Sequence, residues 1–163
     1  MTLMDVLVDF ARTGRVGPLA CGMSLADAEE LLGPGRPHPV HRLRGPDIDG
    51  YPYSWGGLGL TTTGRAVSGI SVSLWPGSTV GLPPLVLPDS VSYDATVLRE
   101  DLVAALDAAG CRHEVNGLLT FGEQSSIVTR PANVCAVFSL PGRDNAVPYA
   151  DRHYLDVIHR HEA

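Results

Sequence analysis

The chain has 163 residues, of which 44% are apolar and 18% are charged, and this is the length and composition of one folded domain. Its 18 acidic and 12 basic residues give a net charge of −6, and every basic residue is Arg because the sequence contains no Lys. The negative net charge argues against nonspecific nucleic-acid binding and favours a basic protein partner. Because no Lys side chain is present, Schiff-base catalysis, a Walker A lysine and a Ser-Lys dyad are excluded.

Two helices are predicted near the start of the chain. The first, from Thr2 to about Thr13, is indicated by apolar residues at helical spacing and by Gly14, which follows them. The second, from Leu25 to Leu32, is preceded by Ser24, whose hydroxyl can accept hydrogen bonds from the free N–H groups of a first turn. Gly33-Pro34 ends this second helix.

A β-hairpin is predicted between Tyr53 and Trp75. Its first strand runs from Tyr53 to Thr63 and is expected to bend or bulge at Gly56-Gly57. A turn at Gly64 leads into the second strand, in which apolar residues alternate with Ser, as they do when one strand face is buried and the other is wet. Pro-rich surface connections are expected before the hairpin, from 34 to 52, and after it, from 76 to 94.

The second half of the chain shows a similar order of elements. A helix from Thr96 to Ala109 is followed by Gly110. Four short β-rich runs, which predict an antiparallel meander, then lie at 113–115, 117–121, 126–129 and 134–140. The final run, Tyr154 to His159, fits either a strand or a helix, and we favour a strand because Leu155-x-x-Ile158 repeats the spacing of Val67-x-x-Ile70.

These elements predict a single α+β domain over residues 1–163, built from an antiparallel sheet with helices on one face. The order of helix, strand and hairpin occurs twice, which suggests two similar halves at about 14–80 and 90–163. Sequence identity between these halves is negligible, and any α+β meander can give the same order.

No catalytic, metal or cofactor site is predicted from residue spacing. His153, His159 and His161 lie near the end of the chain, but no acidic or Cys side chain accompanies them at the spacing of a metal site. The stretch Asp47-Ile48-Asp49-Gly50 lacks the third oxygen ligand and the later Glu of a calcium loop. Gly57-Leu58-Gly59 lacks the third Gly of a dinucleotide-binding fingerprint and precedes a strand.

The compartment is expected to be the cytoplasm of a bacterium. Cys21, Cys111 and Cys135 are odd in number and far apart, which is typical of reduced thiols. The first residues carry no basic segment of a signal peptide, so neither export nor a membrane anchor is expected. The absence of Lys is typical of GC-rich coding, as in high-GC bacteria.

The candidate partner-binding residues are Asp47, Asp49, Tyr51, Tyr53 and Trp55. Tyr and Trp are common hot-spot residues of protein interfaces, and the two carboxylates would attract a basic partner. In the alternative interpretation, the same aromatic rings form the face of a sheet that packs beneath a helix.

The stretch from Gly22-Met23-Ser24 to Leu32-Gly33, followed by Tyr53, Trp55 and Val67-x-x-Ile70, resembles a pattern of small bacterial α+β modules. These modules are the outer-membrane assembly lipoproteins of the SmpA/OmlA type, the β-lactamase inhibitory proteins and the immunity proteins of polymorphic toxin systems. The resemblance covers about a third of the chain and implies a capped helix followed by a hairpin. Of the three, the chain is most similar in charge and in its missing export signal to a cytoplasmic immunity protein.

Two functions are therefore expected. The first is a noncatalytic protein-binding module, most concretely an immunity-type protein that binds and neutralises a toxin domain. The alternative is an enzyme or small-ligand-binding domain whose site is assembled from residues distant in sequence, such as Arg42, Arg44, Asp47, His113 and Glu123. A deep pocket around several of these residues would favour the alternative, and a flat acidic and aromatic surface would favour the first.

Overall fold

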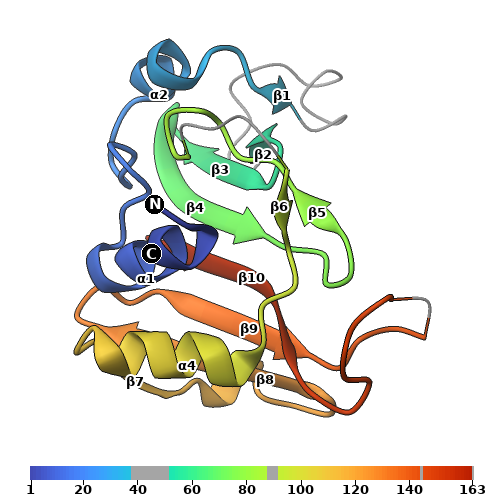
Figure 1. The fold of residues 1–163 in the computed structure, drawn as a ribbon. Helices are drawn as coiled ribbons and strands as arrows, with labels where there is room; N and C mark the ends of the chain where they lie inside the picture. Colours follow the sequence, from blue (N-terminus) through green and yellow to red (C-terminus); the bar gives the residue numbers. More distant parts are fainter. Residues whose placement is uncertain (38–51, 88–91, 144, 163) are drawn as a thin grey trace.

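A computed structural model describes residues 1–37, 52–87, 92–143 and 145–162. In these residues, eight strands form one antiparallel sheet, and two short strands form a second one (Figure 1). In spatial order the large sheet consists of β1 (Arg36–Pro37), β2 (Pro52–Trp55), β3 (Leu58–Thr63), β4 (Ala66–Ser73), β10 (Tyr154–His161), β9 (Cys135–Ser139), β8 (Gln124–Arg130) and β7 (Arg112–Val115). The small sheet pairs β5 (Thr79–Val80) with β6 (Tyr93–Asp94).

The described helices are α1 (Leu3–Thr13), α2 (Leu25–Leu32), α4 (Arg99–Ala108) and the short 3₁₀ helix η1 (Gly117–Leu119). Helices α1 and α4 lie over one face of the large sheet (Figure 1). The predicted α+β class with an antiparallel sheet is therefore confirmed. Among the described residues, no helix has the length and apolar character that crossing a bilayer requires.

The first two helices begin and end where the sequence predicts. Thr2 and Asp5 form a reciprocal capping box at the start of α1, and Gly14 ends the helix in the left-handed conformation. The Ser24 side chain accepts a hydrogen bond of 3.0 Å from the backbone N–H of Asp27, and Gly33 ends α2. Both ends thus satisfy backbone groups that a helix cannot pair internally.

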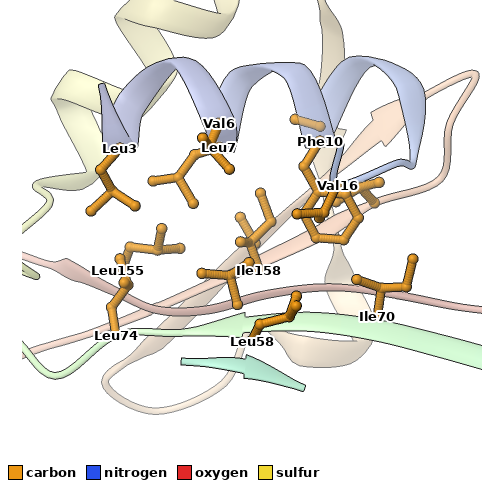
Figure 2. Packing of buried hydrophobic residues seen from close by; sticks show 14 of the residues in the cluster. Leu3, Val6, Leu7, Phe10, Val16, Leu58, Ile70, Leu74, Leu155 and Ile158 are labelled. Atoms are coloured by element: carbon orange, nitrogen blue, oxygen red, sulfur yellow. The ribbon is translucent and has the colours of Figure 1, made fainter. Parts of the chain in front are cut away.

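The main core lies between α1 and the centre of the sheet. Figure 2 shows apolar side chains of α1 pointing toward those of β3, β4 and β10. The labelled residues of this core are Leu3, Val6, Leu7, Phe10, Val16, Leu58, Ile70, Leu74, Leu155 and Ile158. The buried Thr129 hydroxyl also joins the sheet to α1, because it donates a 2.7 Å hydrogen bond to the carbonyl of Ala11.

The predicted long first strand of the hairpin is wrong. The chain turns back at Gly56-Gly57, so that β2 and β3 are separate antiparallel strands with Trp55 opposite Leu58. Gly56 has a φ of +62°, and a Cβ on it would lie 2.3 Å from the carbonyl oxygen of Gly81. The two glycines therefore allow a tight turn against Val80 and Gly81, which a bulge within one strand does not require.

The predicted strand at 117–121 is also wrong. The backbone N–H of Leu119 donates to the carbonyl of Asn116 at 3.2 Å, which closes a 3₁₀ turn in place of a ladder. Apolar residues at 118, 119 and 121 imitate a strand in the sequence, but the Asn-Gly pair before them turns the chain.

The third helix starts at Arg99, three residues later than predicted. The preceding residues are extended, because the backbone N–H of Leu155 donates to the carbonyl of Val97 at 2.8 Å and Leu98 forms a bridge with Tyr154. Pairing with the sheet therefore outcompetes the helical propensity of this segment.

The final segment is a strand, as predicted. β10 pairs with β4 on one side and with β9 on the other, with Ile158 opposite both Val72 and Ala136. The last strands of the two predicted halves, β4 and β10, are thus neighbours at the middle of the sheet. Among the described residues, each half contains one α-helix, α2 or α4, and contributes four strands to the large sheet. The similarity of the halves stays a prediction, because a shared order of elements does not show that they superpose.

Candidate binding surfaces

The predicted partner-binding residues fall into two groups. Asp47, Asp49 and Tyr51 lie outside the described residues. Tyr53 and Trp55 lie on β2, where they are opposite Leu60 and Leu58 of β3, so all four side chains are on the face of the sheet that α1 covers.

The two described aromatic side chains of the hairpin belong to the folded core and its rim. Tyr53 is 5% exposed. Trp55 is partly buried, and its indole N–H donates a 3.0 Å hydrogen bond to the carbonyl of Gly33 at the end of α2. Its ring also lies against Gly35, where a Cβ would come within 2.6 Å of the indole. These contacts hold the end of α2 against the sheet and leave little ring surface for a partner.

A different part of the sheet exposes large apolar side chains. Val115 is 67% exposed, Leu118 is 90% exposed and Phe121 is 61% exposed. These three residues, which we call the apolar corner, lie within the seven-residue path from the end of β7 through η1 toward β8. Neighbouring exposed apolar groups of this size are a common sign of an interaction surface.

Hydrogen bonds hold the backbone of the apolar corner in place. The Thr120 hydroxyl donates to the carbonyl of Asn116 at 2.8 Å and accepts from the backbone N–H of Ser126 at 3.1 Å. The Gln124 side chain donates to the carbonyl of Leu119 at 2.9 Å. The Ser126 hydroxyl, which is buried, donates to the carbonyl of Ala136 at 2.8 Å. The exposed side chains are therefore displayed on an ordered turn, which lowers the entropy lost on binding.

A second loop is attached beside the corner. One ring nitrogen of His153 lies 3.0 Å from the carbonyl oxygen of Glu123, so the loop before β10 contacts the turn before β8. The buried Tyr154 hydroxyl lies 3.0 Å from the backbone nitrogen of Tyr149 and donates to the carbonyl of the same residue at 3.1 Å. The exposed Tyr149 ring in turn carries the Arg152 guanidinium 4.2 Å from its centroid. Tyrosine and arginine are enriched at protein interfaces.

Strand β7 forms the edge of the large sheet next to the corner. Within the described ranges, its ladder partner is β8 alone. The Asn116 N–H donates to the carbonyl of Ser126, and strand alternation then directs the backbone polar groups of His113 and Val115 away from β8. The Glu114 carboxylate lies 3.0 Å from the Arg130 guanidinium. This edge therefore offers backbone hydrogen-bonding groups together with paired surface charges.

The thiol and imidazole near this edge do not form a nucleophile and base. The Cys111 side chain is buried, and burial raises the pKa of its thiol, which disfavours the reactive thiolate. The Nε2 atom of His113 lies 2.8 Å from the Asp107 carboxylate of α4, so the imidazole is held by the helix. Glu123, which was grouped with His113 in the alternative hypothesis, is exposed, whereas Arg42, Arg44 and Asp47 lie outside the described residues.

His159 and His161 share one face of β10, and their ring centroids are 4.8 Å apart. Burial, and then the charge of His161, lowers the pKa of His159. Across the part of the chain that the structure describes, no group of three or more His, Cys, Asp or Glu side chains could hold a metal ion.

The exposure of Leu118 and Phe121 is not predicted from the sequence because both residues are assigned to a strand at 117–121, whereas Val115 belongs to the separate run at 113–115, which lies within β7. The Asn116-Gly117 pair is a turn signal, but the three apolar residues within the next five predict a short β-rich run. Their lack of alternation with polar residues was the available signal that they do not form a half-buried strand.

Comparisons with known protein families, with curated proteins and with solved structures find no match to this chain. Its own surface chemistry is therefore what supports a function.

Proposed function

We propose that this chain is a noncatalytic protein-binding module whose contact surface is centred on the apolar corner. The observation that carries the proposal is the exposure of Val115 at the end of β7 and of Leu118 and Phe121 on the hydrogen-bonded turn that follows. Fully burying a side chain such as Leu or Phe contributes about 1.5–3 kcal/mol, so a partner that covers these groups gains much of the free energy that a specific complex needs.

The most concrete form of the proposal is an immunity-type protein that binds and neutralises a toxin domain in the cytoplasm of a bacterium. The net charge of −6 favours a basic partner, such as a nuclease toxin, over a nucleic acid. Glu123 supplies an exposed carboxylate beside the apolar corner, whereas the exposed Glu114 carboxylate is already paired with Arg130. Charges at such positions chiefly raise the association rate and make it depend on salt.

The outer edge of β7, which pairs with no further strand among the described residues, supports the same surface. A partner segment that pairs with the outward backbone groups of His113 and Val115 would extend the sheet, and it would bring its side chains next to Leu118. Backbone pairing would supply the orientation of the complex, and the apolar corner would supply much of its affinity.

The proposal is tested by screening basic nuclease-toxin domains for binding and then measuring surface-binding kinetics with a domain that binds. Leu118→Ser should weaken binding by about 30-fold, since truncating a central interface residue costs about 2 kcal/mol. Leu31→Ser is the matched control, because Leu31 is an exposed leucine of α2 far along the chain from the corner, and it should leave binding unchanged. The association rate should fall as salt is raised.

The same kinetic measurements decide whether the partner contacts the apolar corner or the hairpin. Tyr51→Ala and Asp49→Asn test the partner-binding residues predicted from the sequence. If Tyr51→Ala abolishes binding while Leu118→Ser binds like the unchanged chain, the contact surface is the hairpin and the corner is not part of it.

A further inference from the structure

A surface hollow lies away from the apolar corner, where the turn that follows β4 meets the loop that leads to β10. Its volume is about 710 Å³. The turn contributes residues 75–78, the loop contributes Asn145 and Ala146, and the two adjacent strands contribute Ser73 and Asp156. The size suits one or two small rings more closely than a single ion.

The two walls of the hollow are held close together. Gly77 has a φ of +83°, and a Cβ at this position would lie 2.9 Å from the backbone nitrogen of Ala146. The Gly77 N–H donates to the Thr96 hydroxyl at 2.9 Å, and the Ser78 N–H donates to the carbonyl of Trp75 at 3.0 Å. The turn is therefore fixed by its own hydrogen bonds and approaches the loop as closely as a glycine allows.

The side chains of the hollow form a distinct chemical set. Trp75 is 59% exposed, so a large part of the indole is free to contact a ligand. The Asp156 carboxylate accepts a hydrogen bond from the Ser139 hydroxyl through Oδ2, which fixes the orientation of the carboxyl plane. Ser78 and Asn145 add a hydroxyl and a carboxamide, both of which can donate and accept hydrogen bonds.

We propose that this hollow binds a neutral saccharide of one or two rings. A sugar ring presents C–H groups on its face, which pack on an aromatic ring such as that of Trp75. Its hydroxyls lie around the rim and both donate and accept, which matches the carboxylate of Asp156 and the carboxamide of Asn145. This function is separate from the proposed protein contact, because the hollow shares no lining residue with the apolar corner.

The lining argues against charged ligands. No Arg or His is among the described residues that line the hollow, so a phosphate or carboxylate would meet Asp156 without a compensating positive group. A small cation binds most tightly where several oxygen atoms converge on one point. Here a single carboxylate stands among groups that also donate, so a ligand with many hydroxyls fits the hollow more closely.

The test uses cellobiose, maltose and N,N′-diacetylchitobiose as soluble neutral probes, with binding measured by saturation-transfer NMR and calorimetry. At least one of them should bind with a dissociation constant of about 1 mM or tighter. Trp75→Ala should weaken that binding by about 10-fold or more, and Asp156→Asn should weaken it by a smaller factor. Phe121→Ala removes an aromatic side chain of similar exposure outside the hollow and should leave saccharide binding unchanged.

Binding to insoluble polysaccharides tests the source of the ligand, and three results would overturn the proposal. Binding to cellulose or chitin that exceeds binding to the disaccharides would identify a polysaccharide chain as the source. Failure of every saccharide to bind, binding of tetramethylammonium alone, or saccharide binding retained in Trp75→Ala would each refute the site. Because Trp75 and Asn145 are exposed, Trp75→Ala and Asn145→Ala should stay folded, and circular dichroism checks this. None of these results depends on the toxin-binding proposal.

Discussion

The β2–β3 hairpin and the apolar corner lie in different halves of the large sheet. The hairpin buries its large apolar side chains, and the apolar corner exposes them. Tyr53 and Trp55 are turned inward, and the Trp55 indole is bonded to Gly33. Leu118 and Phe121 are turned outward on a turn that is ordered by its own hydrogen bonds. Residue type alone therefore does not distinguish an interface from a core. The elements packed against a residue decide its role.

The difference follows from what lies over each turn. At the hairpin, the Trp55 indole packs against Gly35 and donates a hydrogen bond to the carbonyl of Gly33 at the end of α2. The apolar corner instead follows the edge strand β7, and the polar side chains of Thr120 and Gln124 donate hydrogen bonds to backbone carbonyls of the same turn. The first arrangement stabilises the fold, and the second leaves apolar surface that a partner can bury.

The largest expected effect is the contrast in stability between the two regions. Tyr53→Ala should lower the free energy of unfolding by about 3 kcal/mol, because it removes a buried aromatic ring. Leu118→Ser should change it by less than about 0.5 kcal/mol, because the side chain is exposed in the folded state. Urea unfolding measures both. Equal losses in the two variants would show that the corner is also core.

A smaller effect tests whether the corner is an ordered turn. Thr120→Val keeps the shape of the side chain but removes the hydroxyl that bonds to Asn116 and Ser126, so stability should fall by about 1–2 kcal/mol. The control in the other region is Ser54→Ala, whose hydroxyl makes a long 3.4 Å contact with the carbonyl of Arg36 and should matter little. A Thr120→Val variant as stable as the unchanged chain would mean that the apolar corner is not preorganised.

The smallest effect concerns β10, which joins the two halves of the sheet. Burial lowers the pKa of His159 below the ordinary value of 6.5, so the unfolded chain binds the proton more readily. The contribution of His159 to the free energy of unfolding should therefore fall as the pH drops through 6.5 toward the folded value. Melting temperatures between pH 7.5 and 5 should fall less in His159→Gln than in the unchanged chain, whereas His153→Gln serves as the control imidazole. An unchanged pH dependence in His159→Gln would contradict the burial of this ring.

Much of the fold could be predicted from the sequence because its signals are local. Thr2, Ser24, Gly14 and Gly33 define helix ends through bonds within a few residues, and the sequence shows them directly. The start of α4 could not be predicted, because the pairing of Leu98 with Tyr154 joins residues far apart in the chain. Tertiary pairing of this kind overrides local propensity.

The candidate sites were harder to predict for the same reason. The burial of Trp55 depends on the end of α2, which lies about twenty residues earlier in the chain. The hollow at Trp75 brings a turn after β4 together with a loop about seventy residues later, and no spacing in the sequence reports that contact. A pattern of residue types shows which side chains could bind a ligand, whereas exposure and the convergence of distant segments come from the fold.

Amide hydrogen exchange, measured for the chain alone and in complex with a toxin domain that binds it, tests most directly where the partner binds. The proposal predicts slower exchange in the complex over residues 112–124, which include β7 and the apolar corner, with little change over 52–63. Protection confined to residues 47–55, with residues 112–124 exchanging as in the free chain, would contradict the account and place the contact on the hairpin.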